Sequence, residues 1–177
     1  MPTQTLAAGR TVLETPRLLL REFTHADAAF VFRLVNEPSW LRFIGDRGVR
    51  SLPDAVRYLD DGPRASYARN GFGLWCVALR ESGEPVGMCG LVRRAGLADP
   101  DVGFAFLPEA WGHGYARESA AAVLDHARRV LGISRVVAIT NPDNEASIRV
   151  LERVGMAREA TTRLPGIDHD VLLYATS

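Results

Sequence analysis

The chain has 177 residues, of which 47% are hydrophobic and 24% are charged, and its 21 basic and 21 acidic residues give a formal net charge of zero. This length and composition suit one globular domain with a real core and exclude a mostly disordered chain. The balanced charge lacks the basic excess of a general nucleic-acid binder, and no apolar stretch is long enough to span a bilayer. We therefore expect neither nucleic acid nor a membrane as a partner.

The N-terminal residues and the two cysteines bear on where the protein works. Residues 1–9 are predicted to form a flexible tail without the pattern of a secretory signal, and residues 10–177 one domain. Cys76 and Cys89 are too few for a disulfide framework and lack the spacing of a zinc site. We interpret both as buried residues in a reducing compartment and expect a cytoplasmic protein without a metal. Cys89 as a nucleophile is the alternative, and no His-Asp arrangement supports it.

The first third of the chain is predicted to contain one strand and two helices. The strand is expected over 17–22, after Pro16, which cannot donate to a central ladder. Thr24 is a candidate N-cap, with an acid three residues later, for a helix that ends near residues 36–38. A second helix is expected over 53–70, kinked or divided at Gly62-Pro63.

The remaining residues alternate between strand and helix patterns. In chain order we expect strands 72–79, 85–92 and 102–107, a helix over 115–131, a strand over 136–140, a helix from the N-cap Asn144 to Gly155, and strands 156–163 and 169–174. Residues 102–140 thus form a βαβ unit within a set of hairpin-like strands. The sequence predicts a mixed sheet, either of the α+β class or of the α/β class with a largely antiparallel sheet.

The turn between strand 102–107 and helix 115–131 carries the main chemical signal. Gly112 and Gly114 can adopt conformations closed to other residues and let a ligand approach the backbone. The N–H groups of the first helical turn lack intrahelical partners and, with the helix dipole, form an anion site. No Lys-Ser or Lys-Thr follows the second glycine, which excludes a P-loop, and Arg117 stands where a dinucleotide fingerprint needs its third glycine. An ordinary βα turn is the alternative.

This turn resembles the acyl-coenzyme A signature of the GNAT superfamily of N-acetyltransferases, Gln/Arg-x-x-Gly-x-Gly/Ala. The corresponding residues are Trp111-Gly112-His113-Gly114-Tyr115-Ala116, with Trp in place of the usual Gln or Arg. That replacement is familiar in the branch of the superfamily that resembles ribosomal-protein N-terminal acetyltransferases. The same branch is indicated by Thr15-Pro16-Arg17-Leu18-Leu19-Leu20-Arg21 and by residues 141–156, which begin Asn-Pro-Asp-Asn-Glu-Ala-Ser. The resemblance covers residues 12–175.

The resemblance implies a GNAT-like, mostly antiparallel sheet of about seven strands, flanked by helices and splayed between its fourth and fifth strands, 102–107 and 136–140. The pantetheine arm of acetyl-CoA would lie in this gap, against backbone groups of Phe104, Ala105, Phe106 and Leu107. Asn144 and Ser147 would contact it from the other side, although Asn144 can equally be a pure N-cap. The diphosphate would be held by Trp111, Gly112, His113, Gly114, Tyr115, Ala116 and Arg117.

The implied reaction is direct attack of a primary amine on the acetyl thioester, with a backbone N–H near Phe106 stabilising the oxyanion. Many relatives use a Tyr as the acid where this chain has Leu151, which cannot donate a proton. Our hypothesis is that Ser147, one helical turn earlier, donates to the thiolate or orders a water that does. Asp101 is a candidate base and Glu22 its rival.

The acceptor stays open at this point. A peptide N-terminus and a small amine metabolite are both candidates, and the acceptor pocket is expected within residues 36–70, where Trp40, together with Trp75, lines it or belongs to the aromatic core. His113 is a candidate for neutralising phosphate or an exposed loop residue. A monomer and a homodimer are both compatible with the sequence. The alternative function is a non-catalytic acyl-CoA-binding sensor with the same fold.

Overall fold

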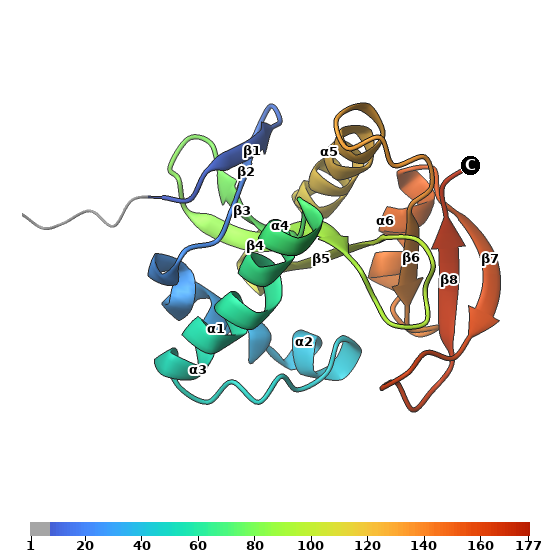
Figure 1. Cartoon of the computed structure of the whole chain (residues 1–177), viewed down its shortest axis with the longest axis horizontal. Coiled ribbons are helices and arrows are strands. Elements are labelled where there is room, and N and C mark those ends of the chain that lie inside the picture. The colour runs from blue at the N-terminus through green and yellow to red at the C-terminus, as the bar shows by residue number, and fades with distance from the viewer. Residues whose placement is uncertain (1–7) are drawn as a thin grey trace, which may run out of the picture.

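One eight-stranded sheet runs through the protein. A computed structural model describes residues 8–177, so residues 1–7 of the tail predicted over 1–9 lie outside the described residues. The strands are β1 (Thr11–Glu14), β2 (Leu18–Arg21), β3 (Leu74–Leu79), β4 (Pro85–Val92), β5 (Asp101–Phe106), β6 (Val137–Thr140), β7 (Ala157–Thr162) and β8 (Val171–Ala175). Their order is β1-β2-β3-β4-β5-β6-β8-β7, and every neighbouring pair is antiparallel except β5 with β6 (Figure 1). The predicted mixed, mostly antiparallel sheet is confirmed.

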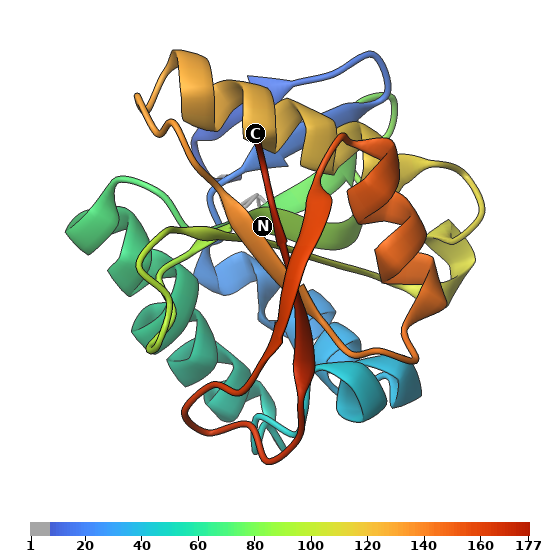
Figure 2. The same ribbon diagram turned by 90° about the vertical axis from the view of Figure 1, so that its right-hand side faces the viewer.

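Helices cover both faces of this sheet. The helices are α1 (Ala28–Val35), α2 (Pro38–Phe43), α3 (Leu52–Leu59), α4 (Ala65–Asn70), α5 (Tyr115–Arg129) and α6 (Glu145–Arg153). On one face, Ala120 and Val123 of α5 and Leu151 of α6 belong to one buried cluster. On the other face, Val31 of α1 and Trp40 of α2 belong to a second cluster (Figures 1 and 2). The two faces therefore have separate cores, the α5–α6 core on the first face and the α1–α3 core on the second.

Two elements were not predicted. β1 is a strand of its own that pairs with β2, which makes eight strands rather than about seven. The residues at 36–38 were expected to end a helix, yet Pro38 also begins α2, because proline suits the first turn, where its missing N–H has no intrahelical acceptor. The expected division of helix 53–70 is confirmed, since a π-type turn over Asp60–Arg64 separates α3 from α4.

β5 and β6 separate almost as soon as they pair. Within residues 8–177 their parallel register is the single pair Asp101 and Val137, and the Val137 N–H donates to the Pro100 carbonyl at 2.9 Å. β6 instead pairs along its length with β8. Because a parallel ladder otherwise continues along both strands, the C-terminal ends of β5 and β6 diverge. The predicted splay between 102–107 and 136–140 is confirmed.

A buried ion pair fixes the chain where it leaves β2. Arg21 donates to both carboxylate oxygens of Asp27 at 2.8 and 2.9 Å, and both side chains are at most 9% exposed. Asp27 also accepts from the Thr24 backbone N–H at 2.9 Å, as the predicted N-terminal pattern requires. The acid three residues after Thr24 thus supports the helix start and holds a buried guanidinium.

Asp27→Ala should lower the free energy of unfolding by about 3–5 kcal/mol, because it leaves a buried guanidinium without its counter-charge. Urea denaturation measures this loss. The matched control is Glu14→Ala, which removes the half-exposed partner of Arg80 and should cost less than about 1 kcal/mol. Equal costs for the two variants would contradict the assignment.

Candidate active site

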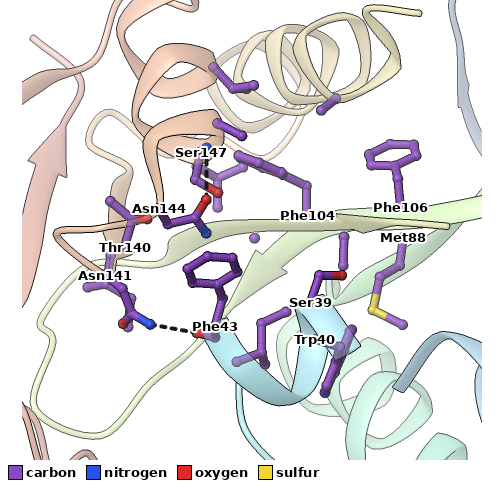
Figure 3. A pocket seen from close by; sticks show the side chains of 18 of the residues that line it. Ser39, Trp40, Phe43, Met88, Phe104, Phe106, Thr140, Asn141, Asn144 and Ser147 are labelled. Atoms are coloured by element: carbon purple, nitrogen blue, oxygen red, sulfur yellow. Dashed lines mark hydrogen bonds between the residues drawn. The ribbon is translucent and has the colours of Figure 1, made fainter. Parts of the chain in front are cut away.

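A cleft of about 860 Å³ opens where β5 and β6 diverge. At one end it is lined by Gly112, Gly114 and the first turn of α5, and at the other by Trp40 and Tyr58. The first set lies beside the α5–α6 core and the second in the α1–α3 core, so the cleft passes from one face of the sheet to the other. Figure 3 shows side chains of α2, β5 and α6 surrounding its middle.

The glycine turn (residues 111–116) has the geometry that its sequence predicts. Gly112 and Gly114 have φ values of 79° and 81°, in the left-handed region that favours glycine. A Cβ at Gly112 would meet no atom within 4 Å, so the backbone there is open to a ligand. Gly114 is the N-cap of α5 and has no side chain to occupy the N–H groups of the first turn. The turn therefore presents free donors to the cleft.

Trp111 and His113 have different places in this turn. Trp111 lines the cleft, and its indole N–H donates to the Phe106 carbonyl at 2.9 Å, which links the glycine turn to β5. The exposed His113 side chain does not line the cleft but stacks on Tyr115, with ring centroids 5.2 Å apart. The structure thus agrees with the exposed-loop interpretation of His113.

Backbone groups of β5 face the gap at alternate residues. The Leu107 N–H already donates to the Val86 carbonyl at 2.9 Å, and the antiparallel alternation directs the backbone of Ala105 to β4 as well. Phe104 and Phe106 therefore direct their N–H and C=O groups toward the gap, where the Phe106 carbonyl already accepts from the Trp111 indole. The predicted backbone bonds from Ala105 and Leu107 to pantetheine were therefore wrong, because the backbone groups of both residues face β4. Ala105 still lines the cleft, whereas Leu107 is buried in the α1–α3 core.

Asn144 and Ser147 lie together at the start of α6. The Asn144 side-chain Oδ1 accepts from the Ser147 backbone N–H at 3.2 Å, so Asn144 is the N-cap of this helix. Both residues line the cleft, and Figure 3 places both side chains on the side opposite α2. Leu151 follows on the same face, is 1% exposed and packs into the core. Asn144 can thus cap α6 and still present its amide to the cleft.

Asp101 is buried at the point where the strands diverge. The side chain is 2% exposed, and its carboxylate accepts from Arg94 Nε at 2.7 Å. Burial raises the pKa of the Asp101 carboxyl above its usual range, although the Arg94 guanidinium acts in the opposite direction. Asp101 lines the cleft, so a carboxyl with a raised affinity for protons lies within it.

Glu22 does not belong to this site, and the prediction that it is the rival base was wrong. Its carboxylate pairs with Arg10 at 2.8 Å and lines a separate, smaller pocket. Glu22 directly follows β2, which is separated from β5 by β3 and β4. At about 4.8 Å per strand, this places it more than 10 Å from the gap.

The α1–α3 side of the cleft is aromatic and depends on the unpredicted helix α2. Trp40 and Phe43 of α2 and Tyr58 of α3 line it, together with Met88. Asn141, in the loop after β6, donates to the Phe43 carbonyl at 3.3 Å, which links α2 to the far side of the gap. Trp75 is instead 1% exposed and lies in the α5–α6 core, so the aromatic-core interpretation holds for it.

The structure also bears on a cysteine nucleophile, a metal site and a membrane-spanning helix. Burial raises the pKa of the Cys89 thiol to about 12, so Cys89 is an inert core residue rather than a nucleophile. Across residues 8–177, no group of three or more His, Cys, Asp or Glu side chains is arranged to hold a metal ion. No helix in the described part of the chain is long and apolar enough to cross a bilayer.

Comparisons with known proteins show which family the chain belongs to. Residues 17–157 match the family model of the acetyltransferase (GNAT) domain. YoaA, an uncharacterised N-acetyltransferase of Bacillus subtilis, is 30% identical over 155 residues, which cover 86% of each chain. An acetyltransferase structure from Agrobacterium tumefaciens superposes with a TM-score of 0.81 at 26% identity and covers 99% of both chains.

A further solved structure shows the same fold with a ligand. RimL, a ribosomal L7/L12 alpha-N-protein acetyltransferase in complex with coenzyme A, has a TM-score of 0.80 at 21% identity, over 94% of this chain and 97% of that chain. At this identity the likeness concerns the fold. Together with the family match over residues 17–157, these findings establish that the chain belongs to the GNAT acetyltransferase family and is an acyltransferase.

Proposed function

We propose that the protein is an acetyl-CoA-dependent N-acetyltransferase that acts through one domain, residues 10–177, and acetylates a primary amine by direct attack. The observation that carries this proposal is the continuous cleft through the sheet. It joins free helix-start amides, the edge of β5 that β6 leaves and an aromatic pocket. Both cysteines are buried free thiols, which is consistent with a cytoplasmic location.

The cleft fits acetyl-CoA in charge and in hydrogen bonding. A diphosphate needs several converging donors, and the first turn of α5 with its dipole supplies them beside the open backbone of Gly112. The gap-facing groups of Phe104 and Phe106 supply the donors and acceptors that an extended amide chain needs. Asn144 and Ser147 face them from α6. We therefore assign the pantetheine arm to the gap.

The acyl transfer then requires two proton movements. The amine nitrogen attacks the thioester carbon, the C–S bond breaks, and the Phe106 N–H stabilises the oxyanion between these events. We assign the proton from the amine to Asp101, directly or through water, because its raised pKa suits a base. We assign the proton to the departing thiolate to Ser147 or to a water that it orders, because Leu151 has no proton to give.

The acceptor pocket favours an amine next to an apolar group. Trp40, Phe43 and Tyr58 form its wall, and its buried carboxylate is already paired with Arg94. An apolar first residue of a peptide N-terminus and the body of a small amine metabolite both fit this description. The likeness to RimL, named for acting on a protein N-terminus, supports the first.

The alternative is a non-catalytic module that holds acyl-CoA as a sensor. The observation that favours it is Leu151, a buried aliphatic side chain where many relatives have a Tyr acid. A thiol-release assay with acetyl-CoA and a panel of peptides and small amines separates the two. Release of thiol only when an amine is present supports the enzyme, whereas binding of CoA without release supports the sensor.

Gly112→Ala should weaken CoA binding about tenfold or more, because the new Cβ occupies ligand space at a backbone φ of 79°. Isothermal titration calorimetry measures the Kd. Gly132→Ala is the matched control, since Gly132 has a φ of 68° and the same open surroundings just beyond α5. It should leave the Kd within about twofold of the wild type. Equal weakening by both variants would oppose the assignment of the glycine turn.

Ser147→Ala should lower kcat about 100-fold with little change in the KM for acetyl-CoA, because a general acid acts mainly on the transition state. Steady-state thiol release measures both parameters. Ser147→Thr keeps the hydroxyl and should retain most of the activity. Unchanged turnover by Ser147→Ala with an accepted amine would remove this role.

The value of kcat/KM should rise with pH until the acceptor amine is deprotonated. This rise should level off near 8 for an α-amino acceptor and only above about 10 for a lysine-like amine. Asp101→Asn should lower kcat/KM across the range and leave the Kd for CoA unchanged, because it removes the base and no coenzyme contact. A flat wild-type profile would argue against attack by the free amine.

A further inference from the structure

We propose that Arg17 and Glu118 form a support that holds the glycine turn in its diphosphate-binding shape, so that a loop from the start of the chain sets the affinity for the coenzyme. The inference rests on the proposed function and concerns two positioning residues that have no assigned role in it. Arg17 belongs to the loop between β1 and β2, and Glu118 to the first turn of α5.

Glu118 gathers the β1–β2 loop onto the first turn of α5. Its Oε1 accepts from the Thr15 hydroxyl at 2.6 Å and from the Arg17 backbone N–H at 3.0 Å. Its Oε2 accepts from Arg17 Nε at 2.7 Å. Burial alone would raise the pKa of Glu118, yet the donors of Thr15 and Arg17 outweigh it and lower the pKa. The carboxylate is therefore ionised and fully used in this contact.

The other end of the Arg17 guanidinium reaches the glycine turn itself. Arg17 Nη1 donates to the His113 carbonyl at 2.8 Å, between the two glycines. The guanidinium lies over the Tyr115 ring, 4.7 Å from its centroid. Two glycines leave a turn with many accessible conformations, and Arg17 fixes the peptide between them from the side. A fixed turn keeps its amides oriented without an ordering cost on binding.

The pair also settles a conflict of charge. A carboxylate in the first turn of a helix is stabilised by the helix dipole, yet it repels an anion bound at the same turn. Glu118 is in that position relative to a diphosphate. The ion pair with Arg17 cancels its charge locally, so Glu118 can hold the loop without opposing the ligand. Arg17 thus has two effects on the diphosphate, one geometric and one electrostatic.

The experiment compares Arg17→Met with the wild type on two acyl donors. Acetyl-CoA carries the diphosphate and S-acetylpantetheine does not, so only the first uses the glycine turn. With an amine that the wild type accepts, Arg17→Met should raise the KM for acetyl-CoA at least tenfold. It should leave kcat/KM for S-acetylpantetheine within about twofold, and calorimetry should show the same loss in the Kd for CoA. Arg10→Met, which removes an exposed pair beside the same hairpin, should change neither donor.

The outcomes separate this inference from the proposed function. An equal loss with both donors, or no loss with either, would overturn the role of Arg17 while leaving the acetyltransferase intact. No binding of CoA by the folded wild type would overturn both. If Arg17→Met does not fold, Arg17→Lys serves in its place, because it keeps the charge but cannot bridge Glu118 and His113 with one planar fork. It should then show a smaller loss confined to acetyl-CoA.

Discussion

The structure depends on a ladder that stops after one step. Asp101 and Val137 are the only register pair between β5 and β6 within residues 8–177, and β6 continues with β8 instead. The remaining edge of β5 keeps backbone groups that a complete sheet would have used. In the proposed complex the pantetheine arm bonds to this edge as an extended, amide-bearing chain. The glycine turn and the aromatic wall formed by Trp40, Phe43 and Tyr58 line the same cleft.

Those parts of the site that follow from local chemistry could be predicted from the sequence. Gly112 and Gly114 indicate a left-handed backbone that other residues avoid, and Asn144 indicates a helix start. The glycine turn and the start of α6 therefore lie where the sequence predicts them. Leu107 could not be assigned correctly, because which backbone groups of a strand face a gap depends on its register with the neighbouring strand. That register is a long-range property and leaves no mark at residue 107.

The other assignments that the sequence left open or made wrongly have the same origin. Glu22 and Asp101 are both carboxylates at strand ends. Only the strand order shows that Asp101 lies at the gap and Glu22 near the opposite edge of the sheet. Trp75 and Trp40 are equally apolar in sequence and both are buried, and only the faces of the sheet on which they lie show that Trp40 also lines the cleft. The helix α2 was missed because Pro38 ends one pattern and begins another.

The passage of the cleft through the sheet has a consequence for the order of events. In the proposed complex the nucleotide end of the coenzyme lies on the α5–α6 side and the amine arrives from the α1–α3 side. Neither reactant blocks the exit of the other, so both can occupy the protein at once. Such an arrangement favours a ternary complex, for which double-reciprocal rate plots intersect rather than run parallel. It needs no covalent acetyl-enzyme intermediate between two half-reactions.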